Sequence, residues 1–255
     1  MLAAAITAIV AGGVLLWRVA RSANVPFDAD TLCPIDEPPR EIVALLLDVS
    51  DEFTEAQQLA IFNGLAAVQQ TVPQFGRIDV YAVSGSTAGV IKPAFAICNP
   101  GDGATASALY QNPAQVQRRW NDFSSRLHAE IVSLTLSSGS PTSPIMEAIR
   151  ATALRTFDDA QLQSVPKRLV IVSDLLQHVP GKLSQYESST PFTTFRKTDY
   201  FSQVRANLSN VRVTVLYLVR SGAPQKWPNH RLFWEEYFAA QGASLDQIEP
   251  VFGDK

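Results

Sequence analysis

Residues 42–54 read IVALLLDVSDEFT, a continuous apolar run that gives way to acidic and hydroxyl side chains at Asp48. An unbroken apolar run of this length is typical of a β-strand that is covered on both faces, as in a parallel sheet. A second run, KRLVIVSD (167–174), ends in the same way at Asp174. Two buried strands that each end in a carboxylate predict a parallel sheet with an oxygen-rich edge.

Strand and helix patterns alternate along the chain after residue 42. Further strands are predicted at RIDVYAV (77–83), GVIKPAFAI (89–97), VRVTVLYLV (211–219) and DQIEPVF (246–252). Helices are predicted at 54–72, from Pro113 onward, at 143–157 and at 232–242. The alternation predicts a doubly wound α/β fold of Rossmann type, with a mostly parallel sheet and helices on both of its faces. The turn-forming letters SGST after residue 83 predict a hairpin, and hence one antiparallel edge strand.

The N-terminal segment differs in composition from the rest of the chain. The stretch MLAAAITAIVAGGVLLW contains no charged side chain, and Arg18 and Arg21 follow directly. With its flanking residues this run is about long enough to span a bilayer. Basic residues follow it, whereas they would precede the apolar run of a cleaved signal peptide. We expect a single-pass membrane anchor at 1–21 rather than a buried helix, then a proline-rich linker at 22–41 and one globular domain at 42–255.

Composition and motifs narrow the classes of function. The 21 basic and 24 acidic residues lack the basic excess that nucleic-acid binding requires, so no nucleic-acid partner is expected. The three histidines lie far apart in the sequence, without the paired spacing of a zinc site. No GxSxG, GxxxxGKS/T or HExxH motif is present. We therefore expect a protein that is not an enzyme, with a metal-dependent, phosphatase-like hydrolase as the alternative.

The carboxyl ends of the predicted strands carry the candidate site. Asp48 and Asp174 each end a strand pattern, and in an open α/β sheet ligands bind at this edge. The stretch GSPTSPIMEAI (139–149) adds Thr142 and Ser143 just before a predicted helix. Hydroxyls and carboxylates that converge from three loops form a hard, oxygen-rich site of the kind that holds Mg²⁺. The alternative is that these groups only cap helices and satisfy loop amides.

At these positions the chain, from about residue 42 to 252, resembles the von Willebrand factor A (vWA) domain. In that family a metal-ion-dependent adhesion site is assembled from a DxSxS motif after the first strand, a Thr before a helix and an Asp after the fourth strand. Asp48 and Ser50 match the first two letters of DxSxS, whereas Glu52 stands at the third. The departure at Glu52 either adds a carboxylate that tightens cation binding or replaces a hydroxyl that the site needs.

The other two motifs of the family also have counterparts. SPIMEAI (143–149) is similar to the TPLxxAL form of the threonine loop and places Ser143 at the threonine position, with Thr142 as the out-of-register alternative. Asp174 in IVSDLLQ is similar to the Asp of the family's SDG, without the glycine. The resemblance implies that the metal ligands are Asp48, Ser50, Ser143 and Asp174, with Glu52 as a fifth candidate.

The resemblance also implies how the site works. The cation would be Mg²⁺, with Mn²⁺ as the alternative, and an acidic side chain of a protein partner would complete its coordination shell. We therefore expect a membrane-anchored interaction module or scaffold of vWA type at a bacterial membrane. A structural subunit with a non-functional metal site, or a hydrolase that uses the same acidic edge, are the alternatives. The long polar loop 178–198, which follows Asp174, is the expected contact for a specific partner.

The two cysteines bear on which side of the membrane the domain lies. Cys33 precedes the first strand and Cys98 ends the antiparallel strand, so both belong to the edge of the sheet opposite Asp48. A disulfide between them would indicate an oxidising compartment such as the bacterial periplasm, and two free thiols are the alternative. Arg18 and Arg21 lie on the domain side of the anchor, which by the positive-inside rule predicts the cytoplasm. The side of the membrane therefore stays open.

Overall fold

The computed structural model describes residues 12–13, 25–83, 85, 93–104, 106, 112–136, 139–220 and 229–252. The predicted membrane anchor at 1–21 lies outside the described residues apart from 12–13, so it stays a prediction. Within the described ranges, no helix has both the length and the apolar character needed to cross a membrane.

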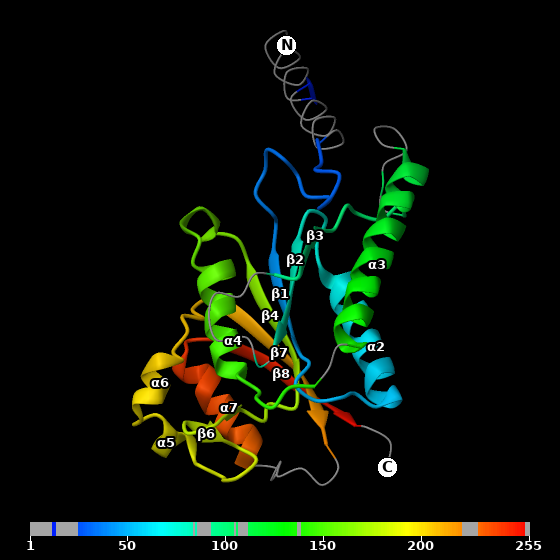
Figure 1. Cartoon of the computed structure of the whole chain (residues 1–255). Coiled ribbons are helices and arrows are strands. Elements are labelled where there is room, and N and C mark those ends of the chain that lie inside the picture. The colour runs from blue at the N-terminus through cyan, green and yellow to red at the C-terminus, as the bar shows by residue number, and fades with distance from the viewer. Residues whose placement is uncertain are drawn as a thin grey trace.

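A six-stranded mixed sheet forms the centre of the domain (Figure 1). In sheet order its strands are β3 (Phe95–Cys98), β2 (Arg77–Val83), β1 (Ile42–Asp48), β4 (Lys167–Ser173), β7 (Val211–Val219) and β8 (Ser244–Phe252). Every neighbouring pair is parallel except β2 and β3, which pair antiparallel. This is the doubly wound order, in which the chain moves outward from the centre in both directions. The predicted α/β fold with one antiparallel edge strand is confirmed.

Helices cover both faces of the sheet (Figure 1). The main helices are α2 (Glu55–Thr71) and α3 (Pro113–Leu136) on one face, and α4 (Ile145–Thr152) and α7 (Asn229–Ala240) on the other. Successive side chains of a strand point to opposite faces. The odd-numbered apolar residues of β1 therefore pack with α2 and α3, and the even-numbered ones with α4 and α7. All of β1 is buried, as its unbroken apolar sequence predicts.

Smaller elements complete the domain. They are η1, a π-helical turn (Ala153–Phe157), η2, a 3-10 turn (Ala160–Leu162), β5 (His178–Val179), β6 (Leu183–Ser184), α5 (Phe192–Phe195) and α6 (Asp199–Gln203). The segment 178–198, predicted as a long polar loop, instead contains the β5–β6 hairpin and α5. The reason is that three apolar side chains of this segment, those of Leu183, Phe192 and Phe195, are buried in the hydrophobic core. The strand predicted at 89–97 begins at Phe95 within the described residues, and its first four positions lie outside them.

A disulfide fastens the segment before β1 to the sheet. Cys33 and Cys98 are bonded, with their Cα atoms 4.8 Å apart, so the structure shows the paired alternative for the two cysteines. Cys98 lies level with the first residues of β2 and β1, at the end of the sheet opposite Asp48. The backbone N–H of Cys98 also donates to the carbonyl of Thr31 at 2.8 Å. The polypeptide therefore enters the domain at the edge that lies farthest from the candidate site.

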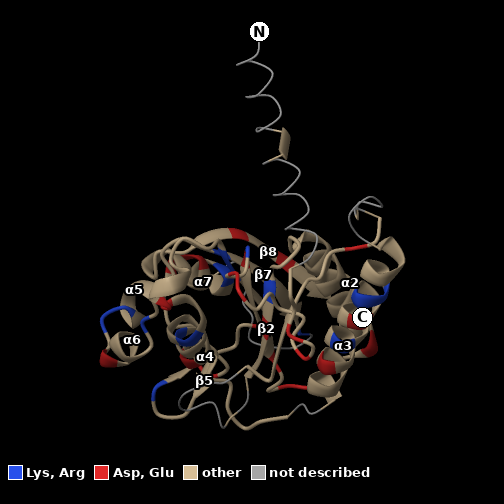
Figure 2. Ribbon diagram, turned by 90° about the horizontal axis from the view of Figure 1, so that it is seen from above, with Lys and Arg blue, Asp and Glu red and all other residues tan. Residues whose placement is uncertain are grey.

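Acidic and basic side chains are interspersed over the elements around the sheet (Figure 2). Several form ion pairs at the surface, such as Arg231 with Glu235 on α7, whose side-chain atoms lie 2.6 Å apart. The distribution agrees with the near balance of charges in the sequence. The expectation that no nucleic acid binds stays a prediction.

Candidate metal centre

The candidate site lies where the chain changes direction across the sheet. After β1 the chain turns to β2 on one side, and after β4 it turns to β7 on the other. Such a switch point opens a crevice at the carboxyl ends of the strands, where ligands of doubly wound folds bind. Asp48 is the last residue of β1, Ser173 is the last residue of β4, and Asp174 follows it. The two predicted acidic ligands therefore lie on the same edge.

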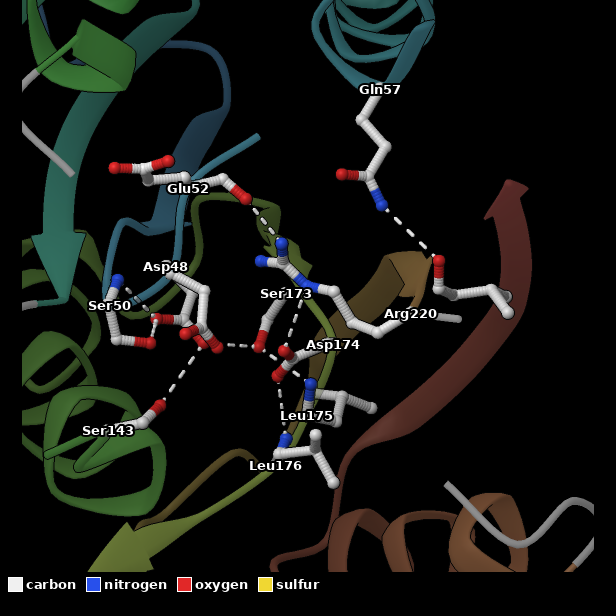
Figure 3. Close-up of polar contacts among 12 residues, drawn as sticks. Asp48, Ser50, Glu52, Gln57, Ser143, Ser173, Asp174, Leu175, Leu176 and Arg220 are labelled. Atoms are coloured by element: carbon white, nitrogen blue, oxygen red, sulfur yellow. Dashed lines mark hydrogen bonds and ion pairs between the residues drawn. The ribbon is translucent and has the colours of Figure 1, made fainter. Parts of the chain in front are cut away.

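Asp48 is the centre of the site (Figure 3). It is 3% exposed, and its carboxylate accepts four hydrogen bonds. The Oγ of Ser50, at 2.6 Å, and the backbone N–H of Ser50, at 3.1 Å, donate to Oδ1. The Oγ of Ser173, at 2.6 Å, and the Oγ of Ser143, at 3.3 Å, donate to Oδ2. Donors from three segments of the chain thus hold the carboxylate in one orientation at the switch point.

Backbone pairing places Ser143 beside Asp48. Ser143 and His178 form an isolated antiparallel bridge, in which each N–H donates to the other residue's carbonyl at 2.9 Å. The N–H of Ser140 donates at 2.8 Å to a backbone carbonyl in the loop after β1. The loop before α4 is therefore tied to the loops that follow β1 and β4. The hydroxyl that reaches Asp48 belongs to Ser143, which favours this residue over Thr142 at the threonine position.

Helix capping does not account for these groups. The side chain of Thr54 caps α2 by accepting the N–H of Gln57 at 3.2 Å, so the start of that helix has a cap of its own. At α4 the N-cap residue is Pro144, which has no capping side chain, and the side-chain oxygen of Gln177 accepts the first-turn N–H of Met146 at 2.9 Å. Asp48 and Ser143 therefore bond to each other rather than to a helix end.

Asp174 lies beside Asp48 and is 2% exposed (Figure 3). Its Oδ1 accepts the backbone N–H of Leu176 at 2.9 Å, and its Oδ2 accepts the Nε–H of Arg220 at 3.2 Å. Arg220 comes directly after β7, and its Nη1 donates to the backbone carbonyl of Glu52. The guanidinium therefore joins the ends of β4 and β7 to the loop after β1.

Burial raises the pKa values of both carboxyl groups. For Asp48, burial outweighs the hydrogen bonds from Ser173 and Ser50, which lower the pKa. For Asp174, burial and the negative charge of Asp48 raise the pKa to about 7, although the N–H of Leu176 and the charge of Arg220 oppose this shift. A buried site in which ionised carboxylates are disfavoured is one that additional positive charge stabilises.

The residue after Asp174 has an unusual backbone conformation. Leu175 has a φ of 58°, in the left-handed region that favours glycine, and it is fully buried. Its N–H donates to the Oγ of Ser173 at 2.8 Å. Its carbonyl accepts the indole N–H of Trp234 at 2.8 Å and the Nε2–H of His230 at 3.0 Å. Leu175 stands where the family's SDG motif has glycine, so hydrogen bonds hold here a conformation that glycine adopts without strain.

The structure separates the five candidate ligands. Asp48, Ser50 and Ser143 are in direct contact, and Asp174 lies on the same edge. Glu52 is exposed, and Figure 3 shows its carboxylate directed away from the other labelled side chains, while its backbone carbonyl accepts the bond from the guanidinium.

Two further residues of the site, Ser173 and Arg220, were not predicted from the sequence. A signal for both was present, because each stands at the carboxyl end of a predicted strand, as Asp174 does. The rule that ligands bind at the carboxyl ends of the strands, which predicts Asp174, also predicts Ser173 and Arg220 when hydroxyl and basic side chains are considered.

A cavity of about 190 Å³ opens beside this cluster, with Ser50, Asp51, Ser143, His178 and Tyr186 in its wall. The phenol of Tyr186 donates to Asp51 at 2.7 Å, and its ring packs edge-on against His178, with 5.6 Å between the ring centroids. The segment 178–198 therefore reaches the candidate site.

The donor set fits a hard divalent cation such as Mg²⁺. The carboxylates of Asp48 and Asp174 and the hydroxyls of Ser50 and Ser143 are oxygen ligands of the kind that Mg²⁺ accepts together with several waters. Within the described ranges, no three His, Cys, Asp or Glu side chains converge as a ready metal cluster. A cation at this edge would therefore depend on the hydroxyl groups and on water for much of its shell.

The sheet has the strand order and the antiparallel edge strand expected of a vWA-like α/β fold. No family model and no curated protein matches the sequence. Solved structures of similar fold include the SpRpn10 VWA domain, at 8% identity over 83% of this chain and 88% of that chain, with a TM-score of 0.40.

Two further structures of similar fold are those of Bacteroides proteins. The hypothetical protein BatB of Bacteroides thetaiotaomicron is 12% identical over 84% of this chain and 91% of that chain, with a TM-score of 0.39. An aerotolerance-related membrane protein of Bacteroides fragilis is 14% identical over 84% of this chain and 92% of that chain, with a TM-score of 0.39. At this level the likeness concerns the fold alone.

Proposed function

We propose that this chain is a membrane-anchored protein-interaction module of vWA type, which binds a protein partner through Mg²⁺, or Mn²⁺, at the carboxyl edge of its sheet. The observation that carries the proposal is the environment of Asp48, a buried carboxylate that three hydroxyl groups orient at the switch point. Hydroxyls gathered around a carboxylate in this way are a ready oxygen shell for a hard cation.

Different residues of this edge would bind the cation and contact the partner. Asp48, Ser50, Ser143 and Asp174 would hold the cation, directly or through water. The bound cation would supply the positive charge that attracts an acidic side chain of the partner. The cavity lined by His178 and Tyr186 lies next to this point and would receive a neighbouring side chain of the same partner.

The disulfide supports a domain that faces an oxidising compartment such as the periplasm, because disulfides are rare in the reducing cytosol. We give it more weight than the positive-inside rule, which rests here on Arg18 and Arg21 alone. The disulfide lies at the end of the sheet opposite Asp48, on the segment that leads from the predicted anchor. An anchored domain would therefore present the candidate site away from the membrane.

The test is affinity capture with the full chain as bait, in Mg²⁺ and in the chelator EDTA, repeated with Asp48→Ala. Asp79→Asn is the matched control, because Asp79 is also 3% exposed but lies about 13 Å back along the strands. We expect a partner that is retained in Mg²⁺ by the wild type and Asp79→Asn, and lost in EDTA and in Asp48→Ala. A partner that the wild type retains in EDTA, and that Asp48→Ala retains in Mg²⁺, would contradict the proposal.

The same proteins separate the hydrolase alternative from the binding module. Turnover of a generic phosphate ester with Mg²⁺ that disappears in Asp48→Ala would favour a hydrolase. We expect no turnover, because the proposed role of the cation is to hold a partner's carboxylate.

A further inference from the structure

Arg220 brings a positive charge into the candidate metal centre. Its side chain is 19% exposed, and its Nε lies 3.2 Å from the Oδ2 of the buried Asp174. Its Nη1 donates to the carbonyl of Glu52, and its Cζ lies 6.0 Å from the ring centroid of Phe53. Figure 3 shows the guanidinium reaching from the end of β7 toward Asp174. Contacts with two other segments of the chain thus hold this side chain at the site.

The backbone that carries Arg220 is fixed as well. The side-chain amide of Gln57, which is buried on α2, donates to the carbonyl of Val219 at 3.3 Å. This bond ties the last residue of β7 to the first turn of α2. The backbone next to Arg220 is therefore held in place, and the guanidinium extends into the site from a fixed position.

The ion pair occupies an atom that a metal ion would need. Of the two carboxylate oxygens of Asp174, one accepts the N–H of Leu176 and the other faces Arg220. A divalent cation that draws on Asp174 must share it with the guanidinium, and two positive charges a few ångströms apart repel strongly where water is largely excluded. The guanidinium also already offsets part of the negative charge that would attract the cation.

We infer that Arg220 is a built-in counter-cation of this edge, which competes with divalent metal for Asp174 and sets the metal affinity of the site. This inference rests on the proposed metal site and adds a determinant outside the three family motifs. Metal loading weakens the contact between the guanidinium and Asp174, because the two positive charges repel each other. The chain is thereby tuned to weak metal binding in its resting form, with the site kept ordered by its own arginine.

The test is calorimetric titration of the full chain with Mn²⁺, comparing the wild type with Arg220→Gln. The matched control is Arg212→Gln, which removes the same charge from the other end of β7, about 26 Å away. We expect Arg220→Gln to bind Mn²⁺ at least tenfold more tightly than the wild type, and Arg212→Gln to bind like the wild type. A second variant, Arg220→Met, removes the charge with an apolar side chain and is used if the glutamine variant does not fold.

A thermal unfolding series gives an independent readout. Without metal, Arg220→Gln is expected to melt below the wild type, because Asp174 loses its ion pair, and saturating Mn²⁺ is expected to raise its Tm by more than that of the wild type. Equal or weaker Mn²⁺ binding by both Arg220 variants, with the wild type binding, would overturn the inference and leave the proposed function standing. Failure of every folded variant to bind Mn²⁺ would overturn both.

Discussion

The hydroxyl of Ser173 donates to the Oδ2 of Asp48 at 2.6 Å and joins the two strands of the switch point. The same oxygen accepts the N–H of Leu175 at 2.8 Å. One side chain thus links the carboxylate at the end of β1 to the turn that presents Asp174 at the end of β4. A ligand that displaced Asp48 would therefore also disturb the hydrogen bond that Ser173 accepts from Leu175.

At Leu175 we predict that glycine is a better replacement than alanine. Both Leu175→Gly and Leu175→Ala remove a fully buried side chain, at a cost of about 2–5 kcal/mol. Alanine retains the strain of the left-handed conformation, whereas glycine relieves it. Leu175→Gly should therefore be more stable than Leu175→Ala by about 1 kcal/mol in chemical denaturation.

Leu176 is the control for this comparison, because it is equally buried and has an ordinary negative φ. There the order should reverse, since glycine loses more backbone entropy on folding than alanine. Alanine variants that are more stable than the glycine variants at both positions would show that the conformation of Leu175 is not strained.

His230 should make folding stability depend on pH. Burial lowers the pKa of His230 to about 4, and its ring is held neutral between the phenol of Tyr217 and the carbonyl of Leu175. In the unfolded chain a histidine takes up its proton near pH 6.5, so the unfolded state binds more protons as the pH falls from there to about 4. The contribution of His230 is therefore present above about pH 6.5 and lost below it, by about 3 kcal/mol in full.

Urea denaturation of the wild type and His230→Gln at about pH 7.5 and about pH 5 measures this contribution. The stability difference between the two proteins should shrink by about 2 kcal/mol at the lower pH. The exposed His128→Gln on α3 is the control histidine. A difference that stays constant with pH would contradict the buried, neutral state of His230.

The disulfide should be a major source of stability. It closes a loop of 65 residues, and in the loop-entropy model a bond of this span contributes about 4 kcal/mol. We expect the double variant Cys33→Ser/Cys98→Ser to lose about this much in guanidinium denaturation, and dithiothreitol to destabilise the wild type alone. Identical wild-type curves with and without reductant would mean that the bond is not formed in solution.

Much of the fold could be predicted from the sequence because it depends on local patterns. The apolar runs at 42–47 and 169–172 contain no polar side chain, as expected of strands covered on both faces, and the order of these strands and the helices predicts a doubly wound sheet. The sequence of the segment 178–198 predicts a polar loop, because its buried aromatic residues lie among polar ones without a helical or alternating period.

The candidate site was less accessible to sequence reasoning. Strand ends locate Asp48 and Asp174 on one edge, but the pairing of Arg220 with Asp174 depends on how the ends of β4 and β7 face each other. The direction of the Glu52 side chain depends on the path of the loop before α2, for which sequence spacing is no guide. The replacement of glycine by Leu175 is visible in the sequence, whereas its retained left-handed conformation is not.

The most direct test of the account is a calorimetric titration of the full chain with Mn²⁺, comparing the wild type with Asp48→Ala and the control Asp79→Asn. We predict saturable binding with one site for the wild type and the control, and no measurable binding for Asp48→Ala. Absence of Mn²⁺ binding by both the folded wild type and folded Arg220→Gln, or an Asp48→Ala variant that binds Mn²⁺ as well as the wild type does, would contradict the claim that this edge of the sheet is a metal centre.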